Sequence, residues 1–232
     1  KYDNGNLVSI GGSDSDSQIL LNDFLLTHKL TGHTDFKVIT PVTSVMAFMS
    51  TPANINISLG IDDSIDISSF DPVANKGDGG INDYLYEKGN QLTILSYALQ
   101  NISNDLKTST DKTQDYFKAI AEELEKEYAE SSAKVDIEDE SFITNVLENL
   151  ITAKTLTITD EAKANTLSAM SGLLPIIQIK TEDNITTGLI RFGLSTFQTD
   201  IKTIANGTAS AETRNNYTSN ILNYIANDQS MD

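Results

Sequence analysis

A chain of 232 residues, with 39% hydrophobic and 21% charged side chains, is long enough to bury a core and is neither disordered nor membrane-like in composition. The formal net charge of −17 argues against nucleic acid or an anionic membrane surface as a partner, because binding either one requires excess positive charge. The chain has no cysteine, which excludes disulfides, thiolate metal sites and cysteine nucleophiles.

The beginning of the sequence indicates a piece of a longer chain. It starts at Lys1, and the first residues lack the apolar segment of a signal peptide. No stretch approaches the roughly 18 consecutive apolar residues that a membrane-spanning helix needs. We therefore expect an excised or processed part of a longer protein, with no membrane span in this segment.

The first forty residues favour extended structure. Stretches 6–12 (NLVSIGG) and 35–40 (DFKVIT) are short, contain β-branched residues and are bounded by Gly, Asp or Ser, which is typical of strands or extended segments. The apolar stretch 20–30 between them is too short to assign. Residues 1–40 are therefore expected to form a short β-like lead-in that packs on the rest of the chain.

Helical signals begin at Thr40. Thr40 and Pro41 combine an N-cap residue with proline at the first helical position, where the missing N–H costs nothing. Thr51 and Pro52 repeat the same pair. We expect two short helical segments here, followed by a connection at 59–72 that is punctuated by Asp and Ser.

Longer helices are expected in the remaining chain, because apolar residues recur there at spacings of three and four. The pattern predicts a mainly α fold: about six long helices with short links, forming one compact bundle over residues 41–232. The apolar stripes contain Leu92, Leu95 and Leu99; Phe117, Ile120 and Leu124; Phe142, Val146 and Leu150; Leu167, Met170 and Leu174; Ile190, Leu194 and Phe197; and Tyr217, Ile221 and Tyr224.

Acidic residues accompany two of these helices. Glu122, Glu123, Lys126 and Glu127 are expected on the solvent face of one helix. The acids within 136–140 precede or begin the next helix, where the helix dipole favours negative charge. A glycosidase would need two such acids facing each other across a cleft. The simpler interpretation of this stretch is a solvated helix N-terminus.

Nucleophilic catalysis and nucleotide binding are disfavoured. A serine hydrolase needs a base, and the only histidines are His28 and His33. The string nearest to a nucleophile elbow, GLSTF around Ser195, falls within a helical pattern. His28 and His33, even with Asp35, lack the spacing of a zinc motif, so we interpret both histidines as polar surface residues. A Gly-x4-Gly-Lys-Ser/Thr phosphate loop is also absent.

Two stretches suggest calcium, the one cofactor that we consider. The first is GGSDSDS at 11–17, where Asp14 and Asp16 would present carboxylate oxygens from a turn. Calcium takes six to eight oxygen ligands, so the neighbouring serines or other segments would have to contribute. The alternative is a turn stabilised by Asp and Ser side chains without a metal.

The second stretch is NKGDGGINDYLYE at 75–87, which partly matches an EF-hand loop. With Asp78 at the fifth loop position, the following glycine and isoleucine also match. Three ligand positions fail, however, because they hold Ala74, Lys76 and Leu85. Calcium in this register is therefore disfavoured.

A glycine turn that opens the first long helix explains the same stretch without a metal. Asn82 or Asp83 would cap that helix. In this interpretation, Asp78 and Asp83 bind calcium only with oxygens from elsewhere in the fold. The expected cofactor set is therefore none, or calcium alone.

Three strings in the first third of the chain resemble a known kind of module. They are GGSD at 11–14, TPVTSV at 40–45, and the segment 59–72 that begins with LGI and ends with DP. This order resembles a helical module of large secreted or surface adhesin-like proteins of aquatic bacteria, which often carry cadherin-like or other calcium-dependent repeats. The family pattern has a Gly-Gly-Thr-Asp turn, a Thr-Pro-Leu-Thr-Thr-Leu helix start and a Leu-Gly-Leu…Asp-Pro segment. The resemblance implies export, a place in a longer chain and a structural or adhesive role, and it supplies no catalytic residues.

We therefore expect a non-catalytic extracellular module, a spacer or interaction domain of a larger bacterial surface protein. Its partner would be an extracellular protein or a glycan. An alternative is a module that binds a small ligand or glycan in a groove near the Gly-rich loop, using Tyr84, Tyr86 and Tyr97. A more remote alternative is a carboxylate-dependent hydrolase.

Overall fold

The computed structural model describes residues 4–10, 25–31, 37–71, 80–106, 115–154 and 156–161, together with positions 163–164, 167, 203, 209–210 and 212. These residues form a two-stranded sheet, five α-helices and one 3-10 turn. In chain order the elements are β1 (Asn4–Ile10), β2 (Leu25–Thr31), α1 (Pro41–Met46), η1 (Pro52–Asn54), α2 (Ile55–Ser58), α3 (Ile81–Leu106), α4 (Asp115–Ser131) and α5 (Glu140–Lys154).

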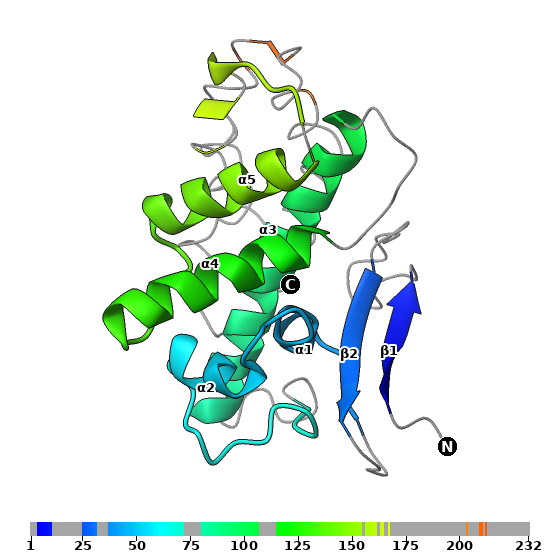
Figure 1. Ribbon diagram of the computed structural model, residues 1–232, viewed down its shortest axis with the longest axis vertical. Coiled ribbons are helices and arrows are strands. Elements are labelled where there is room, and N and C mark those ends of the chain that lie inside the picture. The colour runs from blue at the N-terminus through cyan, green and yellow to red at the C-terminus, as the bar shows by residue number, and fades with distance from the viewer. Residues whose placement is uncertain are drawn as a thin grey trace, which may run out of the picture.

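The described fold is mainly α, as expected, with a small antiparallel sheet at one side (Figure 1). α4 and α5 pack against each other and against α3, while α1 lies between the strand pair and the long helices. The three long helices, α3, α4 and α5, have 26, 17 and 15 residues. The remaining expected helices fall mostly outside the described residues, so the count of six stays a prediction. Among the helices that the structure describes, none has the length and apolarity that crossing a membrane requires.

Of the two stretches expected to be strands or extended segments, the first contains a strand, and the second contains none within residues 37–40, although the backbone of Thr40 is extended. β1 overlaps the expected stretch, but its partner β2 comes from the unassigned apolar stretch rather than from 35–40. Residues 37–40 are not a strand. The backbone groups of Val38 bond elsewhere: its N–H donates to the carbonyl of Ser68 at 3.0 Å, and its carbonyl lies 2.8 Å from Nδ1 of His28.

The two strands differ sharply in burial. In β2, the Thr27 N–H donates to Ser44 Oγ at 2.9 Å, and the same hydroxyl donates to the Thr27 carbonyl at 3.1 Å, which fastens the strand to α1. Positions 5–10 of β1 are all exposed, including Leu7 at 38%, Val8 at 47% and Ile10 at 69%. β1 is therefore held chiefly by its ladder with β2.

The two Thr-Pro signals behave differently in the structure. Thr40 caps α1 through a reciprocal pair of bonds: its hydroxyl accepts from the Thr43 N–H at 3.1 Å, and its N–H donates to Thr43 Oγ1 at 2.8 Å. Thr51 makes no side-chain cap, and Pro52 starts a 3-10 turn instead. The Thr51 N–H donates to the carboxylate of Glu125 on α4 at 2.6 Å, so a distant helix satisfies this helix start.

The core lies where α1, α3, α4 and α5 meet. The predicted stripes of the first three long helices face it, and each fully buried Leu, Ile or Phe contributes roughly 1.5–3 kcal/mol from burial of apolar surface. The stripe members with at most 1% exposure are Leu92, Leu95, Leu99, Phe117, Ile120, Leu124, Phe142, Val146 and Leu150. The loop after α2 adds Leu59 and Ile61 to the same cluster.

The start of α3 corrects the predicted cap. The helix begins at Ile81, and the Tyr84 N–H donates to the Gly80 carbonyl at 3.1 Å. Asn82 and Asp83 therefore lie inside the first turn and do not precede it. Gly80 has φ of +65°, a conformation that glycine adopts without strain, so the glycine part of the expected turn is confirmed at this position.

Candidate functional site

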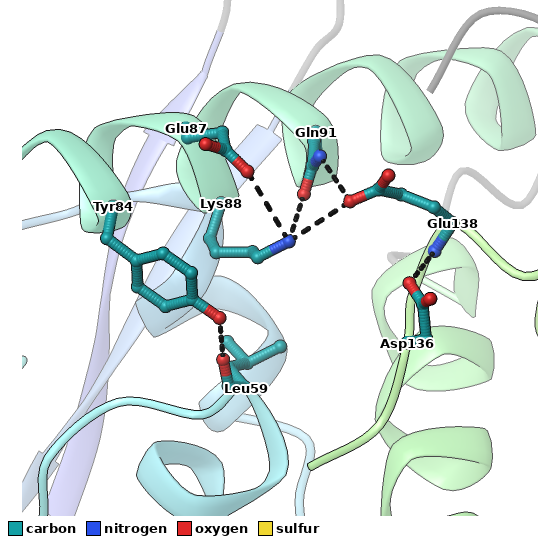
Figure 2. Close-up of polar contacts among 7 residues, drawn as sticks. All are labelled: Leu59, Tyr84, Glu87, Lys88, Gln91, Asp136 and Glu138. Carbon is teal, nitrogen blue, oxygen red and sulfur yellow. Dashed lines mark hydrogen bonds and ion pairs between the residues drawn. The ribbon is translucent and has the colours of Figure 1, made fainter. Parts of the chain in front are cut away.

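A buried charged cluster joins α3 to the segment that precedes α5 (Figure 2). Lys88 is 2% exposed, and its Nζ donates to Gln91 Oε1 at 2.8 Å and to Glu138 Oε1 at 3.2 Å. Gln91 Nε2 donates to the same Glu138 oxygen at 2.7 Å. Glu87 Oε1 lies 3.6 Å from the ammonium. The lysine thus meets three acceptors, two of them carboxylates.

The cluster is largely removed from water. Side-chain exposure is 3% for Lys88, 7% for Glu138 and 16% for Glu87. Burial raises the pKa of Glu87 above its ordinary value, while the charge of Lys88 opposes that rise. Since a buried charge is tolerated only when it is paired and hydrogen-bonded, this arrangement suits a structural tie between two chain segments.

The acidic stretch at 136–140 is therefore only partly the solvated helix start that the sequence suggests. Asp139 caps α5 by accepting from the Ser141 N–H at 2.7 Å, and its bonds with Ser141 lower its pKa. The carboxylate of Glu138, by contrast, turns inward to Lys88. The prediction of a solvated position is wrong for Glu138, because a buried cation on another helix faces it.

Tyr84 supports the same region from the other side of Lys88. Its hydroxyl donates to the Leu59 carbonyl at 2.5 Å (Figure 2). The ammonium groups of Lys88 and Lys134 lie 5.5 and 5.3 Å from its ring centroid, within the range of cation–π attraction. Tyr84 thus fastens α3 to the loop after α2, and both its hydroxyl and its ring have internal contacts.

The other two predicted ligand-binding tyrosines are not brought together with Tyr84 by any described contact. Tyr86 is a half-buried residue of α3. Tyr97 also belongs to α3, but its side chain lies outside what the structure describes. A binding role for these three residues stays a prediction.

A second buried acid, Glu123, was predicted on the solvent face of its helix, and this prediction is wrong. Glu123 is 1% exposed. Its carboxylate accepts from Asn145 Nδ2 at 2.8 Å, from Asn149 Nδ2 at 3.2 Å and from Lys126 Nζ at 2.9 Å. These bonds tie α4 to α5. Asn145 and Asn149 are four residues apart and therefore lie on one face of α5, but this spacing does not identify their acceptor.

The surface interpretation of the histidines fails for His28. This residue of β2 is 1% exposed, and its Nδ1 faces the Val38 carbonyl at 2.8 Å, a geometry in which the nitrogen donates. Burial lowers the pKa of His28 below 6.5. His33 and Asp35, the other members of the rejected zinc trio, lie outside the described residues.

The calcium candidates are mostly untested by the structure. Asp14, Asp16 and Asp78 lie outside the described residues. Asp83 is half-buried in the first turn of α3. Within the described ranges, no group of three or more His, Cys, Asp or Glu side chains is arranged to hold a metal ion. Calcium binding therefore stays a prediction.

A groove of about 620 Å³ lies between the short helices and the loop that follows them. It is bordered by Lys29 of β2, Met46 of α1, residues 52–57 of η1 and α2, and residues 63–68. Neither Tyr84 nor Tyr86 lines it. This groove is therefore a different one from the groove expected near the Gly-rich loop, because its walls come from the Asp- and Ser-rich connection. Residues 72–79 lie outside the described part of the chain, so the expected groove stays a prediction.

Comparisons with protein-family models, with curated proteins and with solved structures gave no match.

Proposed function

We propose that this chain is a non-catalytic module of a larger, exported bacterial surface protein of the adhesin-like kind. It acts as a spacer or interaction domain, built as one compact bundle of about six long helices behind the strand pair. The resemblance of segments 11–14, 40–45 and 59–72 to adhesin-like modules supports the exported setting. The structural observation that supports a spacer or interaction role is the use of buried charge: Lys88, Glu138 and Glu123 form ties between segments that are distant in the sequence.

These ties favour a fixed shape over chemistry. Lys88 and Glu138 are 50 residues apart in sequence, and Glu123 lies 22 residues from Asn145. The side chains of Lys88 and Glu138 each make two hydrogen bonds within the protein, and that of Glu123 makes three. A module whose task is to keep its geometry within a longer chain benefits from such contacts.

The geometry gives less support to a carboxylate-dependent hydrolase. In the usual glycosidase arrangement, two acids flank a substrate across a cleft, roughly 5–9.5 Å apart. The buried acids Glu87 and Glu138 instead share the ammonium of Lys88, at 3.6 and 3.2 Å. That ammonium occupies the space in which a substrate bond would have to lie.

The location is tested on cells. Antiserum raised against the purified chain should label intact cells of the source organism, and external protease should remove the signal. On a denaturing gel, the antiserum should detect a species much larger than 25.3 kDa. A cytosolic protein that the protease leaves untouched serves as the control. Labelling that appears only after lysis, or a band near 25 kDa alone, would overturn the proposed setting.

The absence of catalysis is tested separately with the purified chain. A panel of glycosidase and esterase substrates should give no turnover above that of a heat-denatured sample. The variants Glu87→Gln and Glu138→Gln are assayed beside the unaltered protein. Turnover that either variant loses while its circular dichroism spectrum is unchanged would replace the proposal with the hydrolase alternative.

A second candidate function, ligand binding, is favoured by one specific observation. The groove bordered by Lys29, Met46, 52–57 and 63–68 has a volume within the usual range for small-molecule sites, roughly 300–1,000 Å³. This observation gives the ligand-binding alternative a second location, besides the predicted one at the tyrosines of α3.

A further inference from the structure

The groove bordered by Lys29, Met46, 52–57 and 63–68 combines an apolar surface with a few charged groups. Such a combination is typical of small-ligand sites, in which apolar contacts supply affinity and a small number of polar groups orient the ligand. The apolar side chains that line it are Met46, Pro52, Ile55, Ile57, Ile65 and Ile67.

Hydrogen bonds hold the walls of the groove in place. Asn56, 8% exposed, donates through Nδ2 to the carbonyls of Asp62 and Ile65 at 3.0 and 2.9 Å. The loop opposite α2 is thereby fixed to α2 itself. Asp66 stabilises the next turn by accepting from the Ser68 N–H at 3.0 Å. A groove shaped by the protein's own bonds binds a ligand without a large ordering cost.

The charges at the groove favour a cation. Asp63 and Asp66 contribute two carboxylates, and Lys29 contributes one ammonium. The oxygens of Asp66 accept from uncharged donors of Ser68 and Ser69, and the positive charge of Lys37 also acts on this carboxylate. The exposed carboxylate of Asp63 has no hydrogen-bond or ion-pair partner within the described part of the chain. The overall charge of −17 adds to the attraction for a cation.

The type of cation follows from what lines the groove. Quaternary ammonium groups are usually recognised by aromatic faces, and the described lining contains no aromatic side chain. Carboxylates instead recognise cations that carry N–H donors. The apolar side chains require that the remainder of the ligand be apolar.

We infer that this groove binds a small organic amine, with the apolar body against the isoleucines and the ammonium at Asp63. The inference deepens the interaction role proposed above and rests on it. The binding test uses the purified chain alone and is independent of the cell-surface test. A negative binding result would not contradict the surface location, and a negative cell-surface result would not contradict binding.

The experiment is a titration of the ¹⁵N-labelled chain with hexylammonium, followed by two-dimensional NMR. Saturable shifts should concentrate at residues 52–68 and weaken as ionic strength rises. Asp63→Asn should weaken binding roughly three-fold, and Lys29→Gln should tighten it roughly two-fold, because exposed charges have modest effects. Glu130→Gln removes the same charge from an exposed site on α4 that does not line the groove, so it should leave the affinity unchanged.

Two comparison ligands test whether the groove recognises an ammonium group through its N–H donors. Hexanoate and hexyltrimethylammonium should bind several-fold more weakly than hexylammonium if a carboxylate recognises N–H donors. The inference is supported if hexylammonium binding saturates and its affinity is highest for Lys29→Gln, intermediate for the unaltered chain and Glu130→Gln, and lowest for Asp63→Asn. The inference is overturned if hexylammonium causes no saturable shifts, if hexanoate binds equally well, or if Asp63→Asn and Glu130→Gln have equal effects. It is also overturned if a capped Leu-Lys-Leu peptide, which represents a protein partner, binds and the free amine does not. The spectra themselves report whether each variant is folded.

Discussion

The substitution Lys88→Met tests the central tie of the structure. Methionine keeps an unbranched apolar stem of similar length and removes only the ammonium, so Glu138, with 7% side-chain exposure, loses the Lys88 ion pair. Removing one partner of a buried ion pair costs roughly 3–5 kcal/mol, because the other charge stays buried and uncompensated. For a chain of this size, the melting temperature should fall by roughly 6–20 °C.

The loss of stability in Lys88→Met should become smaller as the pH falls. Burial already raises the pKa of Glu87 in the unaltered protein, while the charge of Lys88 opposes that rise, so the pKa of Glu87 should rise further in the folded variant. A folded state with raised carboxyl pKa values binds protons more readily than the unfolded chain. Its deficit in stability should therefore shrink as the pH falls from 7 toward 5.

The assay is urea unfolding followed by circular dichroism at pH 7 and pH 5. The matched control is Lys118→Met, since Lys118 is 52% exposed and pairs with Glu122 on the surface of α4. This control should change the free energy of unfolding by less than about 0.5 kcal/mol. The reasoning would be refuted if Lys88→Met lowered the free energy of unfolding as little as the control does, or if that decrease were as large at pH 5 as at pH 7.

Three further outcomes are expected from unfolding measurements. Gly60 has φ of +71°, and an added Cβ would lie 2.6 Å from Lys134 Cδ, so Gly60→Ala should lose about 1–2 kcal/mol. Glu123→Ala leaves the amides of two α5 asparagines without their acceptor and should lose about 2–3 kcal/mol. His28 has a lowered pKa in the folded protein, so its contribution to the free energy of unfolding is present above pH 6.5 and is lost as the pH falls through the folded-state pKa. His28→Gln should therefore reduce the fall of the free energy of unfolding between pH 7 and pH 5.

Controls within the chain sharpen these three tests. Gly89→Ala lies in open space in the middle of α3 and should gain about 0.5–1 kcal/mol, the opposite sign to Gly60→Ala. Glu122→Ala, at the exposed position beside Glu123, should stay within about 0.5 kcal/mol. Equal effects of the two glycine changes, equal effects of the two glutamate changes, or an unaltered acid slope for His28→Gln would contradict the respective argument.

Local signals explain why the helical part of the fold could be predicted. Thr40 and Pro41 specify a helix start within two residues, and the structure contains that start with its reciprocal cap. The stripe of Leu92, Leu95 and Leu99 likewise follows from helical periodicity alone, and all three are buried. Such features depend on residues within one or two turns, so the sequence displays them directly.

β2 could not be assigned in the same way. A half-buried strand alternates polar and apolar residues, but in β2 the consecutive polar residues Thr27 and His28 are both buried. Their partners, Ser44 and Val38, are supplied by the chain that follows the strand. The strand is therefore specified by tertiary contacts, and its local pattern resembles neither a strand nor a helix.

The buried charges escaped prediction for a related reason. Lys88 stands between Leu85 and Leu92 at spacings of three and four, on the apolar stripe of α3. That placement indicates a buried lysine, but it does not name the partner, which lies 50 residues further on at Glu138. Glu123 is similar, three residues after Ile120 on the inward face of α4. Sequence periodicity shows which positions face inward and not which charges meet there.

The exposed strand β1 has a mechanical consequence if the chain is part of a longer protein under tension. Force that enters before Asn4 and leaves through the helices acts on the paired ends Asn4 and Thr31, so the ladder opens one pair at a time toward Ile10 and Leu25. β2 stays fastened to α1, and the helical core keeps its packing. Each released residue adds at most about 3.4 Å of contour length. The strand pair would then lengthen under force before the helical core unfolds.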